Sequence, residues 1–325
     1  MLTDILAFCG GLVLLLVGGR LLVAASVDTA TRCRVSPLVV GLTLVAWGTS
    51  APELALNLIS AFKQRGDLAL GNVVGANVCN MAVVLGVCAL LSPLTIQERL
   101  IRVEIWLNAA ILMFITVPGL TWGFTKLEAG MMLGIFGGYS MWTIMSALRK
   151  TDKAASPEEA NSLGDDPMLE RGPMSWIMIG TCFVGGLSLL SFGGSLASDG
   201  AAGIAIGLGI PQAIVGVTIV SIGTTLPELV TGIMAVKKGQ TDLAMGNAIG
   251  SCLFNAGAIF GLVGLIVPPA VDHSLTLPLV YMGLLALALI PISRSFRKTV
   301  SRLEGGLLLA SYLIFLIVSA VLTTW

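Results

Sequence analysis

Two stretches of the sequence decide the fold, Gly48-Thr49-Ser50-Ala51-Pro52-Glu53 and Gly223-Thr224-Thr225-Leu226-Pro227-Glu228. Each lies near the middle of an apolar run, over residues 36–62 and 211–236, that is long enough to cross a membrane as a helix. Glycine and proline both weaken a helix, so we expect each helix to break at its motif. An ionised glutamate at the bilayer centre costs about 3 kcal/mol on insertion scales, so two in equivalent positions indicate that the protein uses them.

The composition is that of an integral membrane protein. Apolar residues make up 56% of the chain and charged residues 11%, whereas a soluble domain has about 25% charged residues. The net charge is zero and aromatic residues are few, which argues against a nucleic-acid partner. The first positive charge, Arg20, follows the first apolar run, which predicts a membrane helix rather than a cleaved signal peptide.

The apolar runs predict an all-α protein with ten membrane-spanning helices, of which helices 2 and 7 are broken. The runs cover residues 2–26, 36–62, 67–94, 100–121, 126–148, 174–198, 211–236, 242–267, 274–292 and 302–324. A polar segment over residues 151–173 interrupts them. It is expected to be a linker between two five-helix halves, residues 1–150 and 174–325.

Basic residues gather in alternate loops, which predicts the orientation. The loops between spans 1–2, 3–4, 5–6, 7–8 and 9–10 hold 14 of the 18 lysines and arginines, and the other loops hold Lys63, Arg65 and Lys126. Cytoplasmic loops are the ones enriched in such residues. We therefore expect both termini outside the cell (inner) membrane and the linker in the cytoplasm.

The two halves are repeats of each other. At an offset of 175, residues 40–93 match residues 215–268 at 20 of 54 positions. The matches include Pro52 with Pro227, Glu53 with Glu228, and Asn80 with Asn255. Because each half has an odd number of spans, the second half is expected to run inverted, as in many transporters.

The motifs supply oxygen ligands for a hard cation. Besides the two glutamates they hold hydroxyls at Thr49, Ser50, Thr224 and Thr225, and a helix break frees backbone carbonyls. Calcium takes six to eight such oxygens, and two carboxylates match one divalent charge.

Structural interpretations of the same residues stay open. Ser50 with Glu53, and Thr225 with Glu228, have the spacing of a capping box with proline in the first turn. The asparagines and glycines of the repeat are also common where membrane helices pack together.

Residues outside the two motifs have simpler interpretations. Asp67 and Asp242 are expected to be acids at helix N-termini. The six cysteines form no CxxC pair and His273 is the only histidine, which argues against a disulfide framework or a zinc site. Cys79 and Cys252 lie near the motifs but are expected to serve packing.

At these residues the sequence resembles the cation/calcium antiporter family, which includes the sodium/calcium exchangers. Members have two inverted repeats, each with a G-T-S-x-P-E motif and a later G-S/N-x-x-G-S-N-x-x-N/D motif. Here residues 71–80 read GNVVGANVCN and residues 246–255 read GNAIGSCLFN. The resemblance covers the whole ten-span plan, and the short linker is like that of a prokaryotic member. Ala76 and Cys252 depart from the pattern, where serine and asparagine are common.

The resemblance implies a set of cation-binding residues. Glu53 and Glu228 are expected to be the central ligands, with Thr49 and Thr224 completing the group on the metal ion. The same cavity is expected to include Ser50, Thr225, Asn80, Asn255 and Ser251, and the carbonyls of Ala46 and Ser221.

The sequence therefore predicts a secondary active cation antiporter, not an enzyme, without a cofactor. Sodium/calcium exchange by alternating access is the leading hypothesis, and calcium/proton and potassium-dependent exchange remain alternatives, because two protons or two monovalent ions also neutralise two carboxylates. A cation channel with the same ligands is the alternative of another class. An intramembrane hydrolase is disfavoured, since Ser50 and Thr49 have no basic partner within the membrane. The expected partners are inorganic cations and the lipid bilayer, and no obligatory protein partner is evident.

Overall fold

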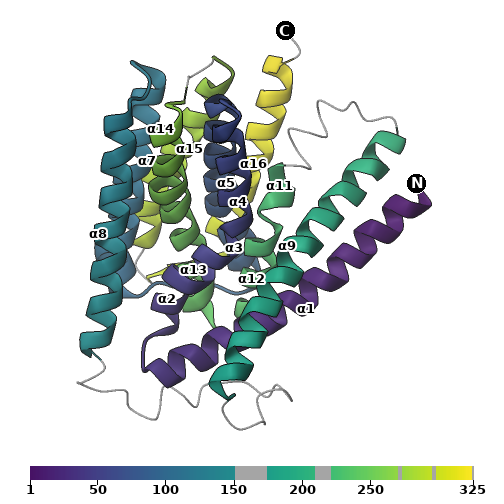
Figure 1. Cartoon of the computed structure of the whole chain (residues 1–325), viewed down its shortest axis with the longest axis vertical. Coiled ribbons are helices and arrows are strands. Elements are labelled where there is room, and N and C mark those ends of the chain that lie inside the picture. Colours follow the sequence, from purple (N-terminus) through teal and green to yellow (C-terminus); the bar gives the residue numbers. More distant parts are fainter. Residues whose placement is uncertain (151–173, 209–220, 270–272, 295–297, 324–325) are drawn as a thin grey trace.

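Helices make up nearly all of the structure, a computed structural model that describes residues 1–150, 174–208, 221–269, 273–294 and 298–323 (Figure 1). The predicted linker over residues 151–173 lies outside the described residues.

The first half begins with α1 (Leu2–Cys33), followed by a second span in four pieces. These pieces are α2 (Pro37–Val40), the π-helix η1 (Gly41–Val45), α3 (Ala46–Thr49) and α4 (Ala51–Phe62). The next span joins α5 (Gly66–Cys79), the π-helix η2 (Asn80–Val84) and α6 (Leu85–Leu91). The half ends with strand β1 (Leu94–Thr95), the π-helix η3 (Leu100–Glu104), α7 (Ile105–Leu120) and α8 (Lys126–Lys150).

The second half has a similar succession of helices, but its strand lies between its last two helices, whereas β1 precedes both α7 and α8. It comprises α9 (Trp176–Gly207), α11 (Ser221–Thr224), α12 (Leu226–Lys237), α13 (Thr241–Leu253), the π-helix η5 (Phe254–Ile259), α14 (Phe260–Ile266), the 3-10 helix η6 (His273–Leu275), α15 (Thr276–Ser293), strand β2 (Thr299–Val300) and α16 (Arg302–Thr323). Helices α4 and α12, like α6 and α14, begin and end at the same offset of 175 that relates the two sequence repeats. The sequence repeat is thus also a repeat of secondary structure.

The described residues contain eight helices long and apolar enough to cross a membrane, and a ninth span if the bent pair Pro37–Thr49 and Ala51–Phe62 counts as one. The protein is therefore a multi-pass membrane protein. The remaining predicted span, over residues 211–236, lies only partly within the described residues, as α11 and α12. The count of ten stays a prediction.

Helices α1 and α9 lie side by side and slanted across the other helices (Figure 1). Each has 32 residues, which at 1.5 Å per residue gives about 48 Å, more than the roughly 30 Å hydrocarbon core. The predicted ends at residues 26 and 198 were therefore wrong, because α1 continues through polar residues such as Asp28 and Arg32, and α9 continues past Asp199 through glycine, alanine and isoleucine.

Glycines let α1 and α9 touch through their backbones. A Cβ atom on Gly11 would lie 2.5 Å from the nitrogen of Ala197, and one on Gly18 would lie 2.8 Å from the carbonyl oxygen of Gly186. No larger residue fits there without moving one helix. The two helices therefore form a closely packed pair.

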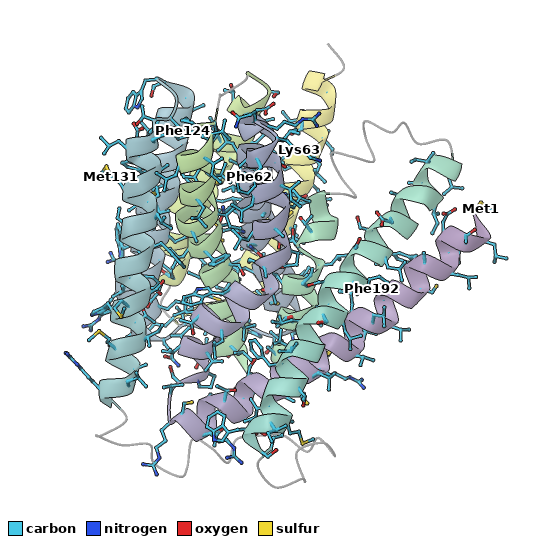
Figure 2. All side chains as sticks on the ribbon, viewed as in Figure 1. Met1, Phe62, Lys63, Phe124, Met131 and Phe192 are labelled. Atoms are coloured by element: carbon cyan, nitrogen blue, oxygen red, sulfur yellow. The ribbon has the colours of Figure 1, made fainter. Side chains whose placement is uncertain are left out.

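Most of the other long helices stand upright beside this pair (Figure 1). Helix α13 packs against α2, η1, α3 and α12, and among the upright helices α7 packs with α15, α8 with α14, and α6 with α16. Large apolar side chains cover the outside, among them the exposed Met131 and Phe192 (Figure 2). An apolar exterior around polar interior residues is the pattern expected in lipid.

A short strand pair braces the end of α13. Strand β1 pairs antiparallel with β2, Leu94 opposite Val300. Next to it, the Gln97 side-chain amide donates to Asp242 at 2.5 Å, and the hydroxyls of Thr95 and Thr241 lie 2.7 Å apart. Asp242 and its repeat mate Asp67 both lie in the first turn of their helices, as predicted.

A buried ion pair fixes α7 against α8. The Arg99 guanidinium contacts the Glu104 carboxylate at 3.0 Å, and Glu104 is 0% exposed. The same guanidinium donates to the Thr143 hydroxyl at 3.1 Å and lies over the ring of Trp142. Since its charge compensates a carboxylate that has no access to water, Arg99 has a structural role that an exposed arginine does not.

We therefore expect Arg99→Ala to lower the free energy of unfolding by about 3 kcal/mol, because Glu104 loses its cationic partner and keeps only the Tyr139 hydroxyl, which donates to it at 3.3 Å. Thermal unfolding in detergent, followed by circular dichroism, measures the loss. Arg102→Ala is the matched control, since Arg102 pairs with the exposed Glu98 and is itself 75% exposed. Equal midpoints for the two variants would contradict the role given to Arg99.

Candidate functional site

The first motif interrupts the second span. Helix α3 ends at Thr49, Ser50 has φ −87° and ψ 7°, and α4 begins at Ala51 with Pro52 in its first turn. The two segments meet at 46°. The predicted break is confirmed, and it follows from Pro52, which has no N–H to continue the helical ladder.

The second motif has the same local structure. Helix α11 ends at Thr224, Thr225 has φ −92° and ψ 1°, and α12 begins at Leu226 with Pro227 in its first turn. The chain therefore restarts a helix directly before each glutamate.

The capping-box interpretation was wrong. Neither Ser50 nor Thr225 caps the following helix with its side chain, because a capping residue needs an extended backbone, which neither has. The Ser50 hydroxyl instead donates to Oε1 of Glu228 at 2.8 Å. A residue of the first motif thus contacts the glutamate of the second.

The two glutamates lie in the protein interior. Glu53 is 2% exposed and Glu228 is 0% exposed, and the two motifs to which they belong are joined by the Ser50–Glu228 hydrogen bond. Within the described ranges, both carboxylate oxygens of Glu53 and Oε2 of Glu228 have no hydrogen-bond donor. Such oxygens are costly in an apolar interior unless a cation or a proton accompanies them.

The spans that contain α5 and α13 bring further polar atoms to the interior. Asn80 begins η2, Asn255 lies in η5, and both are buried, as is Ser251. Among the described residues, Oδ1 of each asparagine and Oγ of Ser251 have no hydrogen-bond partner. Two of the four π-helices in the described residues, η2 and η5, contain the predicted asparagines, and π-helical segments inside α-helices are frequent at functional sites.

The other predicted residues divide into two groups. Thr49 and Thr225 are buried and Thr224 is half-buried, each at its motif. The carbonyl of Ala46 accepts the N–H of Ser50 at 3.1 Å and the hydroxyl of Thr49 at 3.4 Å. This carbonyl therefore stays in the helical ladder, and its predicted role as a cation ligand stays a prediction.

The side chain of Ser221 lies outside the described residues, although Ser221 begins α11.

Two cysteines near the site pack among polar groups. The Cys79 thiol lies 3.5 Å from the Tyr312 hydroxyl, and the Cys252 thiol donates to the carbonyl of Asn77 at 3.9 Å. Within the part of the chain that the structure describes, no group of three histidines, cysteines, aspartates or glutamates is placed to hold a metal ion. A cation at this site would be bound by two carboxylates and neutral oxygens.

Comparison with known proteins agrees with this arrangement. The family model for the sodium/calcium exchanger protein matches residues 3–145 and 179–321.

The chain belongs to the sodium/calcium exchanger family.

Relatives match this chain over nearly its full length. The sodium/calcium exchanger MaX1 of Methanosarcina acetivorans is 32% identical over an alignment of 341 positions, which spans 95% of this chain and 96% of MaX1. A protein of Alkalimonas amylolytica that bears the name of an antiporter, CaxA, is 32% identical over 316 residues, 93% of this chain and 94% of its own. A structure of the sodium-calcium exchanger NCX_Mj, soaked with 10 mM Na⁺ and no Ca²⁺, superposes with a TM-score of 0.79 at 26% identity, covering 96% of this chain and 97% of the other. As a family member, the exchanger is a transporter rather than an enzyme.

Sequence analysis missed three buried polar residues of the exchanger. Asn247 contacts both motifs, Asn57 donates to the carbonyl of Glu53 at 2.7 Å, and Thr231 lies one turn after Glu228 with its hydroxyl buried. Asn247 could have been found, since it matches Asn72 in the repeat. Asn57 and Thr231 align with apolar residues or glycine in the other repeat. Their position one helical turn after a motif glutamate is the only sequence signal that could have identified them.

The exchanger's second span approaches α13 at a pair of glycines. A Cβ atom on Gly246 would lie 2.6 Å from the carbonyl oxygen of Leu38 and 3.1 Å from the Cα atom of Gly41. These are backbone atoms, which yield only if a helix moves.

We expect Gly246→Ala to displace α13 from η1 and to lower the free energy of unfolding by about 1–3 kcal/mol. Thermal unfolding in detergent measures this. The control is Gly138→Ala on the exposed face of α8, where a Cβ atom has no neighbour within 4 Å. If Gly246→Ala were as stable as this control, the close approach would not constrain α13.

Proposed function

We propose that the protein exchanges sodium for calcium across the membrane, with Glu53 and Glu228 as the central cation ligands. The observation that supports this most directly is the meeting of two buried carboxylates from the two halves, one of which accepts a hydrogen bond from the other motif at 2.8 Å. Among the described residues no lysine or arginine pairs with either carboxylate, and two uncompensated negative charges favour one divalent cation or its monovalent equivalent.

The ligand set is made of hard oxygens. Glu53 and Glu228, with the hydroxyls of Thr49 and Thr224, are proposed to bind the metal ion. Ser50, Thr225, Ser251, Asn80 and Asn255 line the same region, and the backbone oxygen of Ser221 is retained as a candidate ligand. Calcium prefers six to eight oxygens, many of them neutral, which fits two carboxylates supplemented by hydroxyls and amides.

Charge balance explains the proposed coupling. Two ionised carboxylates without a bound cation are costly in free energy to enclose in an interior without water. One Ca²⁺ or two Na⁺ neutralise them and remove this cost. The protein therefore crosses between its two states only when loaded, and a third Na⁺ would make each cycle electrogenic. Two protons would also neutralise both carboxylates, and one potassium ion would neutralise one of them. Charge balance therefore allows several counter-ions, and the ion-gradient experiment below identifies which one is used.

Alternating access is proposed to use motion of the α1–α9 pair relative to the other helices. The closely packed α1–α9 pair lies across the bundle that holds the broken spans (Figure 1), and motion of one repeat-derived unit against another is the usual mechanism of inverted-repeat transporters. By the loop charges, both termini are placed outside the inner membrane and residues 151–173 in the cytoplasm.

If the glutamates bind calcium, Glu53→Gln or Glu228→Gln abolishes calcium flux, because either substitution removes half of the site's negative charge. Calcium uptake into proteoliposomes, driven by an imposed sodium gradient, measures this. Glu98→Gln is the matched control, since Glu98 is 60% exposed and lies outside both motifs. Normal flux in both glutamine variants would sink the proposal.

The same vesicles distinguish an exchanger from a channel. We expect calcium to accumulate against its own gradient when sodium is imposed on the opposite side, because exchange couples the two ions. Replacing the sodium gradient in turn by a proton or a potassium gradient identifies the counter-ion. Calcium movement that follows only its own electrochemical gradient would instead establish a channel.

A further inference from the structure

Asn247 joins the two halves of the site. It lies on α13, is 0% exposed, and occupies the space between the break after α3 and the start of α12. Its Oδ1 accepts the hydroxyl of Thr49 at 3.3 Å, and its Nδ2 donates to the backbone carbonyl of Glu228 at 3.4 Å. One amide side chain thus contacts both motifs.

The orientation of this amide follows from chemistry. A backbone carbonyl only accepts hydrogen bonds, so the NH₂ group of Asn247 faces Glu228 and the amide oxygen faces Thr49. The Thr49 hydroxyl has a single proton and two lone pairs. The hydrogen bond to Asn247 directs this proton to the amide oxygen and leaves the two lone pairs of the Thr49 hydroxyl to face elsewhere.

A different acceptor competes for that proton. The Glu228 carboxylate lies beside the first motif, because the Ser50 hydroxyl next to Thr49 donates to its Oε1 at 2.8 Å, while its Oε2 has no donor among the described residues. If Thr49 donated to this carboxylate, its proton would stand where a cation must approach, and one carboxylate oxygen would be occupied. Charge-assisted hydrogen bonds are stronger than neutral ones, so acceptors for the Thr49 proton are needed elsewhere. The Asn247 amide oxygen at 3.3 Å is one, and the Ala46 carbonyl of the same helical turn, at 3.4 Å, is the other.

We propose that Asn247 is a positioning residue that takes the Thr49 proton, and so keeps the Thr49 lone pairs and the Glu228 carboxylate available to the transported cation. This rests on the proposed function, because it assumes that the cation binds at the two glutamates. Asn247 itself contacts the ligands and not the ion.

The repeat provides an internal comparison. Asn72 is equivalent to Asn247 at the offset of 175, but it is only half-buried and its side chain makes no hydrogen bond to the described residues. The sequence repeat alone would assign both asparagines the same role. In this structure only Asn247 is placed to perform it.

The test is equilibrium binding of ⁴⁵Ca²⁺ to the purified full-length protein in detergent, with sodium as competitor, which requires no transport. We expect Asn247→Ala to weaken calcium binding about tenfold, the effect of one buried hydrogen bond. Asn72→Ala, the matched control, is expected to change it less than about twofold. Asn247→Leu, which keeps the volume, replaces the alanine variant if that variant does not fold.

A double-mutant cycle separates positioning from packing. Thr49→Val removes the hydroxyl at constant shape. If Asn247 acts through Thr49, then Asn247→Ala adds no further loss in the Thr49→Val protein. An equal loss in both backgrounds, or unchanged binding in the single variant, would overturn the inference. Absence of sodium-displaceable calcium binding in the unmodified protein would overturn the proposed function instead.

Discussion

Two carboxylates held together out of reach of water are the constraint on which the rest of the structure depends. Glu53 and Glu228 belong to different halves of the chain, and the Ser50–Glu228 hydrogen bond joins those halves at the site. To bring both acids to one place, two spans must be interrupted, and each interruption uses the same glycine, hydroxyl and proline residues. An interior this apolar tolerates the two charges only if polar groups of neighbouring helices surround them.

Helix α13 is the element that unites these features. Its glycine at position 246 admits the backbone of the second span, its Asn247 contacts both motifs, and its first turn is tied to the strand pair through Asp242. The helix is therefore held at one end and close-packed at its middle. A helix fixed in this way keeps side chains in position while other parts of the protein move.

Local sequence signals predicted much of this arrangement. Hydrophobic runs located the spans of the described part within a few residues, except at the ends of α1 and α9, where neither the polar stretch after residue 26 nor Asp199 with the glycines and alanines that follow it ends the helix. The breaks followed from Pro52 and Pro227. The capping boxes did not form, because the spacing of Ser50 and Glu53 is compatible with a cap while the backbone at Ser50 is not.

The sequence by itself determined the membrane class, the repeat, the family and the two acidic motifs, since each depends on composition or on residues adjacent in the chain. Only the tertiary structure decided that Ser50 bonds to Glu228 rather than to its own helix, that the Ala46 carbonyl stays in the helical ladder, and that Asn247 but not Asn72 contacts the motifs. The physical reason is that these contacts join residues far apart in sequence, across helices whose relative positions are set by packing. A repeat makes two residues equivalent in sequence, but their surroundings become different once the two halves pack against each other.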